Sequence, residues 1–487
     1  MSFTRPGRPS AAPGLKPLAC AALLACGAAG VSAQSLSDIY DAARAYDPTY
    51  LGARDTADSA QYRYEQVKAL NRPSVSATAT ATGEHTDFPG SVPARQTSKI
   101  LQGTVSAQQS LFNRTNDLTI EQAERAFEAA HATLTVAEED LIVRVASAYF
   151  DVLSAADALQ TVQANERGIG EQLASAKRNF EVGNATITDT REAQARYDLS
   201  VAQEVAARND LQVKQVTLDQ LVGRTGVVPH PLPPTVTLPP VLPSQAEDWV
   251  RLAQSDNPTV QQARLSLEVA QLETSKARAG HLPTLGVGVS YGRTGVDSNY
   301  APASSVGTGN TATVGVTLNV PIFAGFSVQN RIKETLLLEQ KAQTDVDAAV
   351  NGVTVGTRTA FLGAQAGSAQ VKALEAAEAS SKVALEATQL GYKVGVKVNL
   401  DVLNAQTQLY TTERDLSKAR YDYLLATLKL RQAAGSLTAN DLLPISALLV
   451  AAPQPAVPAV MPQTGPASVP TTSTAPTPAT VPPPRKP

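Results

Sequence analysis

Apolar side chains recur along this chain with two different periods, and the first is the period of a helix. From 120 to 141 and from 402 to 430 the apolar residues step by three and four positions. A sustained period of about 3.5 residues favours a coiled-coil seam. The stretch from 113 to 179 holds no proline and only two glycines, Gly168 and Gly170. We therefore expect one helix of about 100 Å there, at about 1.5 Å per residue. Several shorter helices in a bundle are the alternative.

The second period is two, the period of a β-strand. Polar and apolar residues alternate over about 72–85 and 97–112, and again over about 282–295 and 311–323. The polar positions are small and mostly uncharged, which is typical of transmembrane β-barrel strands with a polar lumenal face and an apolar lipid face. A half-buried sheet in a water-soluble domain would alternate in the same way. The barrel is favoured because a helix of about 100 Å does not fit a compact domain.

The two halves of the chain repeat the same landmarks in the same order. Pro48 recurs as Pro258, 210 residues later, and Gly183 recurs as Gly395, 212 residues later. Shared Ala-rich composition would not keep proline and glycine in register over such a length, so the pattern indicates an internal duplication.

The expected organisation follows from this duplication and from composition. It comprises a signal peptide at 1–33, a first repeat at 34–228, a Pro-rich connector at 229–247, a second repeat at 248–445 and a disordered periplasmic tail rich in Pro, Ala and Thr at 446–487.

Residues 1–33 have the pattern of a secretory signal peptide. A basic start precedes an apolar run from Leu18 to about Gly30, and small residues follow up to Ala33, after which cleavage is expected. Acylation of Cys26, as in a lipoprotein, is the alternative. Both cysteines, Cys20 and Cys26, lie in this leader, so we expect no disulfide in the mature chain.

Composition and motifs argue against several classes of function. The formal net charge is −3, so no basic field favours nucleic acid. No later stretch has about 18 uninterrupted apolar residues, the signature of a membrane-spanning helix. The four histidines are scattered, and neither a phosphate-binding glycine loop nor a nucleophile motif occurs. We expect no enzyme activity, no catalytic residue, no metal and no cofactor.

The number of strands bears on the assembly. Strand edges cannot face lipid, so a membrane barrel must close. One chain offers four candidate strands, whereas membrane barrels have at least about eight. Two chains would supply about eight strands, which leave an interior filled by side chains, and three would supply about twelve and leave a pore. The strand count therefore favours an oligomer without choosing between the two.

Several segments carry a resemblance to a known family. They are DIYDAARAYDPTY at 38–50, AYFDVLSAADAL at 148–159, RNFEVGNATITDTREAQARYD at 178–198, GHLPTL at 280–285 and GYKVGVKVNLDVLNAQTQLY at 391–410. They resemble the TolC-like outer-membrane channel-tunnels of Gram-negative export systems, and the resemblance covers about 34–445.

The resemblance implies a mixed α+β membrane protein that forms a homotrimer. Its transmembrane β-barrel, with four strands from each chain, would lie in the lipid of the outer membrane and continue into a long coiled-coil α-helical barrel in the periplasm. It further implies a passive duct for type I protein secretion or drug efflux. A periplasmic adaptor protein and an inner-membrane pump, ABC-type or proton-driven, would dock onto this duct.

Two glycine-centred breaks interrupt the helical pattern at equivalent places. Gly183 and Gly395 supply the backbone freedom for tight helix-reversal turns. Thr188 or Asp189 is expected to cap the helix after the first turn, with Glu192 completing a capping box after Asp189. Asn399 is expected to cap the helix after the second turn.

The resemblance assigns a gate to the same turns. It implies a latch that links Thr188 and Asp189 to Lys397, and Asp189 to Tyr392. It also implies that three copies of Asp401 form an acidic ring that favours cations at the narrowest point of the lumen.

This chain departs from the family pattern at two gate positions. Lys397 stands where the family often has Arg, and an ammonium lacks the planar fork of a guanidinium, so we expect a looser latch. Asn404 stands where the best-known members have a second Asp, so the lumenal constriction would rest on Asp401 alone and would trap cations more weakly.

Two other functions compete with an export duct. A trimeric coiled-coil surface protein anchored by a β-barrel would usually carry strands only near its C-terminus, whereas strands are expected here in both halves. A general diffusion porin would need more strands per chain and no long helices.

Overall fold

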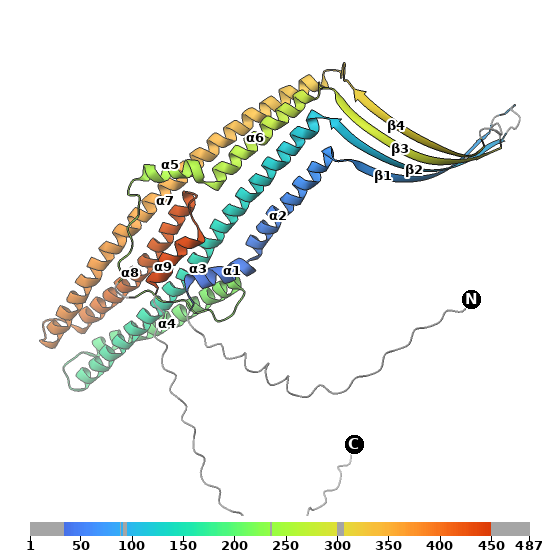
Figure 1. The fold of residues 1–487 in the computed structure, drawn as a ribbon. Coiled ribbons are helices and arrows are strands. Elements are labelled where there is room, and N and C mark those ends of the chain that lie inside the picture. The colour runs from blue at the N-terminus through green and yellow to red at the C-terminus, as the bar shows by residue number, and fades with distance from the viewer. Residues whose placement is uncertain (1–33, 88, 91–94, 234–235, 300–305, 450–487) are drawn as a thin grey trace, which may run out of the picture. The chain divides into compact units, whose positions relative to one another are not determined.

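A computed structural model describes residues 34–449 except 88, 91–94, 234–235 and 300–305 (Figure 1). The expected signal peptide at 1–33 and the part of the expected tail beyond residue 449 lie outside the described residues.

Helices and strands follow the same order in the two halves of the chain. The first half contains α1 (Leu36–Tyr46), α2 (Pro48–Lys68), a short 3₁₀ turn η1 (Ala69–Asn71), β1 (Ser74–Asp87), β2 (Arg95–Phe112), α3 (Arg114–Glu181) and α4 (Ile187–Val222). The second half contains α5 (Ala246–Asp256), α6 (Pro258–Ala279), β3 (Thr284–Ser298), β4 (Gly307–Asn319), α7 (Ser327–Lys393), α8 (Asn399–Ala433), a 3₁₀ turn η3 (Ala439–Asp441) and α9 (Leu442–Leu448).

Two helices are far longer than the helices of ordinary domains. α3 has 68 residues and α7 has 67, so each is about 100 Å long. The expectation of one continuous helix over 113–179 is confirmed, and the alternative of several short helices is wrong. Gly168 and Gly170 do not end α3, because its other residues keep the backbone helical on both sides. No helix among the described residues has the length and apolarity needed to cross a bilayer.

The four described strands form one antiparallel sheet in the order β1-β2-β3-β4. The strands lie close to the expected ranges, but residues 320–323 are not part of β4. Pro321 explains this end, because proline has no N–H to donate to a neighbouring strand. β1 and β4 each pair with one neighbour only, so both outer edges of the sheet lack a strand partner within the described chain.

The register places apolar and polar residues on opposite faces of this sheet. One row across the strands is Ala77, Val105, Tyr291 and Ala312. The adjacent row, on the other face, is Ser76, Ser106, Ser290 and Thr313. Side chains of the apolar face are exposed to a large extent, 72% for Val75 and 75% for Val314. Nothing in the described chain covers this face.

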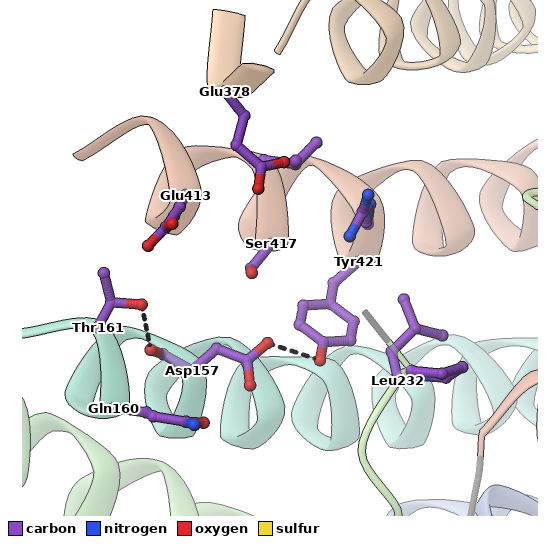
Figure 2. Close-up of a pocket in the computed structure, with 11 residues that line it drawn as sticks. Asp157, Gln160, Thr161, Leu232, Glu378, Glu413, Ser417 and Tyr421 are labelled. Atoms are coloured by element: carbon purple, nitrogen blue, oxygen red, sulfur yellow. Dashed lines mark hydrogen bonds between the residues drawn. The ribbon is translucent and has the colours of Figure 1, made fainter. Parts of the chain in front are cut away.

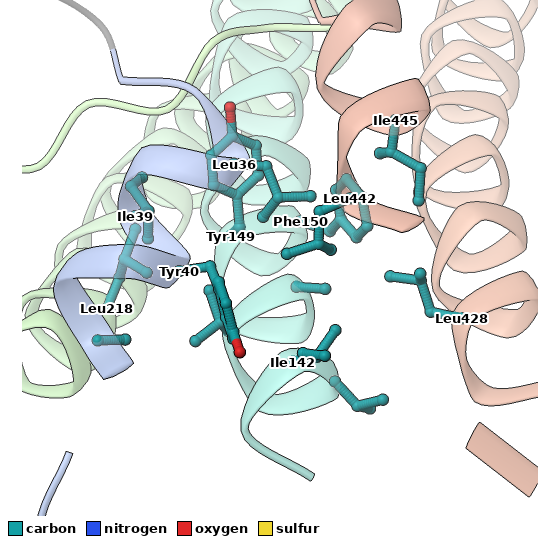
Figure 3. Close-up of a cluster of buried hydrophobic side chains, with 14 of the residues drawn as sticks. Leu36, Ile39, Tyr40, Ile142, Tyr149, Phe150, Leu218, Leu428, Leu442 and Ile445 are labelled. Carbon is teal, nitrogen blue, oxygen red and sulfur yellow. The ribbon is translucent and has the colours of Figure 1, made fainter. Parts of the chain in front are cut away.

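The largest hydrophobic core lies where both ends of the described chain meet the long helices (Figure 3). Tyr40 of α1, Tyr149 and Phe150 of α3, and Leu442 and Ile445 of α9 are all buried there. The tail was expected to begin at residue 446, and this boundary is wrong. α9 continues to Leu448 because it buries apolar side chains in this core, and its proline lies in the first turn, where no N–H is required.

The described part of the connector is held by side chains of the helices. Tyr423 donates a hydrogen bond to the Pro239 carbonyl at 2.6 Å, and Trp249 donates to the Pro243 carbonyl at 2.9 Å. Proline carbonyls accept such bonds although proline has no N–H. The connector is shorter than the expected 229–247, because α5 begins at Ala246.

Candidate functional site

The candidate gate lies at the turns of two helical hairpins, which we call the first hairpin (α3 and α4) and the second hairpin (α7 and α8). Both turns use a glycine with the same left-handed backbone, φ 81° at Gly183 and at Gly395. Asn184 donates its N–H to the Asn179 carbonyl at 2.7 Å, and Val396 donates to the Gly391 carbonyl at 2.9 Å. These six-to-one bonds define Schellman motifs at the ends of α3 and α7.

The helix after the first turn begins earlier than expected. Its N-cap is Thr186, whose hydroxyl accepts a hydrogen bond from the Asp189 N–H at 3.2 Å. The Asp189 carboxylate in turn accepts from the Thr186 N–H at 2.9 Å and from the Thr186 hydroxyl at 2.7 Å. The expected cap at Thr188 or Asp189, with Glu192 as its partner, is therefore wrong. Asp189 is instead the acidic member of a capping box that starts at Thr186.

The helix after the second turn has a weaker start. Its N-cap is Val398, which has no side-chain acceptor, and Asn399 is the first helical residue and not the expected cap. Asp401 reaches back to the Val398 N–H at 3.4 Å, so only half of a capping box is present. Asn399 is 4% exposed, and its amide oxygen and nitrogen have no partner among the described residues.

Within one chain, the residues expected to form the latch have other partners. Lys397 Nζ lies 3.5 Å from Asp401 Oδ2, with both side chains partly exposed. Tyr392 accepts a hydrogen bond from the Asn179 amide at 3.1 Å, and Asp189 is engaged with Thr186 as described above. The described residues offer the Thr188 hydroxyl no hydrogen-bond partner within the chain.

Contacts between the two hairpins join both α3 and α4 to α8 and were not anticipated from the sequence. Arg196 donates to the Asn404 amide oxygen at 3.1 Å. Further along, Gln406 is 4% exposed and donates to the Asn165 carbonyl at 3.4 Å. A Cβ at Gly168 would lie 1.9 Å from Gln406 Nε2. The mid-helix glycine was the available signal, because it marks a close approach of a neighbouring side chain.

A polar cavity of about 340 Å³ lies between α3, α7, α8 and the connector (Figure 2). Tyr421 donates a hydrogen bond to Asp157 at 2.9 Å, and burial raises the pKa of Asp157. Burial also raises the pKa of Glu413, and Glu378 nearby raises it further. No local sequence pattern marks this cluster, because its members come from three separate helices and the connector. The described residues contain no group of His, Cys, Asp or Glu that could hold a metal.

Comparison with known proteins gives consistent matches over most of the chain. A family model described as outer membrane efflux protein matches residues 39–224 and 249–436. The outer membrane protein TolC of Vibrio cholerae is 33% identical over 435 residues, which are 89% of this chain and 98% of that protein. The alkaline protease secretion protein AprF of Pseudomonas aeruginosa is 34% identical over 322 residues, 65% of this chain and 66% of that protein.

Solved structures share the fold. The outer membrane protein VceC from Vibrio cholerae superposes with a TM-score of 0.69 at 19% identity, covering 82% of this chain and 96% of that one. At this level of identity the similarity concerns the fold alone.

Proposed function

Because this chain belongs to the outer membrane efflux protein family, we propose that it is the outer-membrane exit duct of a tripartite export system. It is located in the outer membrane, extends into the periplasm and acts as a passive channel. The names of its relatives support this function, because they include outer membrane proteins and a protease secretion protein. An enzymatic role finds no support in these matches.

One observation carries the proposal of a duct. The sheet exposes an apolar face and leaves the outer edges of β1 and β4 without strand partners in the described chain. In lipid each unpaired backbone group would cost several kcal/mol, so the edges of neighbouring chains must pair. Three chains would close a barrel of about twelve strands, wide enough to enclose a pore. We propose this trimer, in which each chain contributes two copies of one duplicated unit.

The gate is proposed to lie at the two hairpin turns. Latches from Thr188 and Asp189 of one hairpin to Lys397 of a neighbouring chain, and from Asp189 to Tyr392, would hold the tunnel closed. Each exposed ion pair contributes about 0.2–1 kcal/mol, so three symmetric sets would favour the closed state by only a few kcal/mol. A docking partner can supply such a bias through differential binding.

Asp401 is proposed to project into the lumen as the single acidic ring, beside Asn404. The ring is partly neutralised within each chain, because Lys397 lies 3.5 Å from the Asp401 carboxylate. We therefore expect weak cation preference and weak block by trivalent cations from the periplasmic side. Block as strong as in a relative with two acidic rings would contradict this assignment.

The partners and the cargo follow from the same proposal. A passive duct needs energy from elsewhere, so we propose a periplasmic adaptor and an inner-membrane pump, ABC-type or proton-driven. The family description names efflux without naming a cargo, and the AprF similarity favours protein secretion. A surface stalk anchored by a barrel is not favoured by either match.

Conductance in planar lipid bilayers tests the duct and its gate together. Wild-type protein should give a small pore, and Asp189→Ala should give a larger one if Asp189 is a latch. Thr186→Ala is the matched control, because it removes the capping hydroxyl and keeps the carboxylate. Equal gains in both variants would assign the effect to the cap. Absence of any conductance in wild-type protein would contradict the duct.

Chemical cross-linking tests the trimer. The only cysteines of the sequence are Cys20 and Cys26, both in the expected leader. Thr78→Cys on β1 combined with Thr313→Cys on β4 places new thiols on the two sheet edges. A flexible bis-maleimide should then give a ladder that ends at three chains. A ladder ending at two chains would indicate an eight-stranded barrel and contradict the trimer.

A further inference from the structure

The apolar face of the sheet ends in two cations on neighbouring strands. Counting away from the helices, Arg293 is the first charged residue on this face of β3, and Lys99 is the first on this face of β2. Both side chains are exposed. Neither forms an ion pair or a hydrogen bond with the described residues. A guanidinium and an ammonium beside an apolar surface therefore retain their capacity to bind an anion.

Small residues form a shallow hollow beside these cations. Two successive rows on the apolar face consist of Ala79, Gly103 and Arg293 and of Ala81, Leu101 and Gly295. The hollow is lined by all six of these residues, together with Thr80, Gln102 and Thr308. Four of its lining residues are alanine or glycine, Leu101 is 66% exposed, and Arg293 is its one charged lining residue. The hollow thus places small apolar side chains beside a positive group.

The position of Arg293 along the strand corresponds to the edge of a membrane. Leu285 begins the apolar face of β3, and Arg293 lies eight residues further along the same face. At about 3.3 Å per residue and a tilt of about 40°, the two differ in height by about 20 Å. The apolar band of such barrels is about 25 Å tall. Tyr291, which is 57% exposed, lies just below Arg293, where interfacial aromatic residues are found.

We propose that this hollow binds a phosphorylated lipid of the outer leaflet. Arg293 and Lys99 hold a phosphate group, and an acyl chain of the same lipid covers the alanine and glycine residues. Asp297, which lies opposite Lys99 in the register, limits the net positive charge. The inference rests on the proposed function, because it requires the sheet to lie in the outer membrane.

Native mass spectrometry of the detergent-solubilised oligomer tests this site. The probe is bis-phosphorylated lipid A, compared with phosphatidylethanolamine. A juxtamembrane cation contributes about 1 kcal/mol to the binding of anionic lipid. Arg293→Gln and Lys99→Gln should therefore each weaken lipid A binding about five-fold, and the double variant about 25-fold. Arg293→Lys should keep most of the affinity, and Asp297→Asn should raise it.

Arg95→Gln is the matched control. Arg95 is a cation on the same face of β2, but its guanidinium already lies 3.6 Å from the Asp87 carboxylate, so its loss should leave lipid A binding unchanged. Equal binding by wild type and the double variant, or equal loss with Arg95→Gln, would overturn the proposed site.

Planar-bilayer conductance separates this inference from the proposed function. Arg293→Gln should insert and conduct like wild type, since the outward face does not line the pore. If the protein conducts but binds lipid A no better than phosphatidylethanolamine, the lipid site alone is wrong. If wild-type protein neither inserts nor conducts, the outer-membrane placement on which the site rests is wrong.

Discussion

The first and second hairpins make the same turn but begin their returning helices differently. Both turns end in a left-handed glycine and a six-to-one hydrogen bond. After the first turn, Thr186 and Asp189 form a complete capping box. After the second turn, Val398 offers no acceptor, and the Asp401 carboxylate lies near Lys397. The equivalent carboxylates thus differ: Asp189 completes a capping box, whereas Asp401 makes a long contact with the Val398 N–H and also an exposed ion pair with Lys397.

The long helices of the hairpins also differ in how much they are covered. α3 buries 17 side chains and α7 only six, although their lengths are nearly equal. α3 is packed by α2, α4, α6 and α8, whereas α7 contacts mainly α8, α6 and α5. Exposed apolar residues such as Leu337, Val355 and Leu362 remain on α7. The second hairpin therefore has the surface that a neighbouring chain would cover in the proposed trimer.

The largest effect on stability is expected at the buried carboxyl group of Glu139, which lies in the first hairpin. Glu139 of α3 is 5% exposed, and burial, together with Glu138, raises its pKa from its ordinary value of 4.5 to about 7. A raised pKa means that the folded state prefers the protonated acid. Glu139 therefore costs no stability below pH 4.5, and its cost grows as the pH rises to about 7.

Glu139→Gln should remove this pH dependence. The stability at pH 8 should rise by up to about 3 kcal/mol per chain, at about 1.4 kcal/mol for each pKa unit, with no gain at pH 4. Thermal unfolding of the solubilised protein at several pH values measures the effect. Glu386→Gln, an exposed carboxylate of α7, serves as the control. A gain of equal size at pH 4 would show that packing and not ionisation is responsible.

The next largest effect on stability should be equal in the two hairpins. Gly183→Ala and Gly395→Ala each force a side chain into the left-handed region, which costs about 1–2 kcal/mol. An added Cβ would meet no atom within 4 Å at either position, so the cost is conformational only. Hydrogen exchange of the amides at each turn should report the same increase in opening. A clear difference between the two variants would show that another chain packs against one of the turns.

Two substitutions should reverse the difference in helix capping between the hairpins. Each should change the stability of one helix start by about 1 kcal/mol. Thr186→Ala should loosen the first turn of α4, because it removes the acceptor for the Asp189 N–H. Val398→Thr should tighten the first turn of α8 by a similar amount, since Asp401 already stands at the position that completes the box. Hydrogen exchange in these two turns measures both changes. An unchanged α8 in Val398→Thr would mean that Lys397 holds Asp401 away from the cap.

The sequence predicted the long helix over 113–179, the four strands and the two turns because each depends on local pattern. Period, proline and Gly183 or Gly395 suffice for those elements. It misplaced the cap of α4 because three capping residues, Thr186, Thr188 and Asp189, stand within four positions. The length of the turn after the glycine decides among them. In both hairpins the N-cap is the third residue after that glycine.

Contacts between the hairpins could not be predicted from the sequence for a different reason. Asn165 and Gln406 are 241 residues apart, and neither stands in a motif that names its partner. Gly168 alone indicated such a contact, because no local feature of the helix requires a glycine at that position. The cavity around Asp157 and Glu413 is of the same kind, since its members meet only after α3 and α8 have packed.

The smallest effect on stability, and the most informative one for the gate, is expected at Lys397. Its pair with Asp401 is exposed, at 53% and 39% of the two side chains, so Lys397→Gln should change stability by less than about 1 kcal/mol. Its effect on conductance should be larger if Lys397 also links to Asp189 of a neighbouring chain.

Double-mutant cycles of Lys397→Gln with Asp401→Asn and with Asp189→Asn separate the two partners. Coupling between Lys397 and Asp401 should appear in the free energy of unfolding, because that pair is formed within one chain. Coupling to Asp189 should appear in the conductance of the closed oligomer. If the conductance effects of Lys397→Gln and Asp189→Asn simply add, the two residues act independently. The difference between the hairpins would then be a matter of helix capping alone, with the gate held by other contacts.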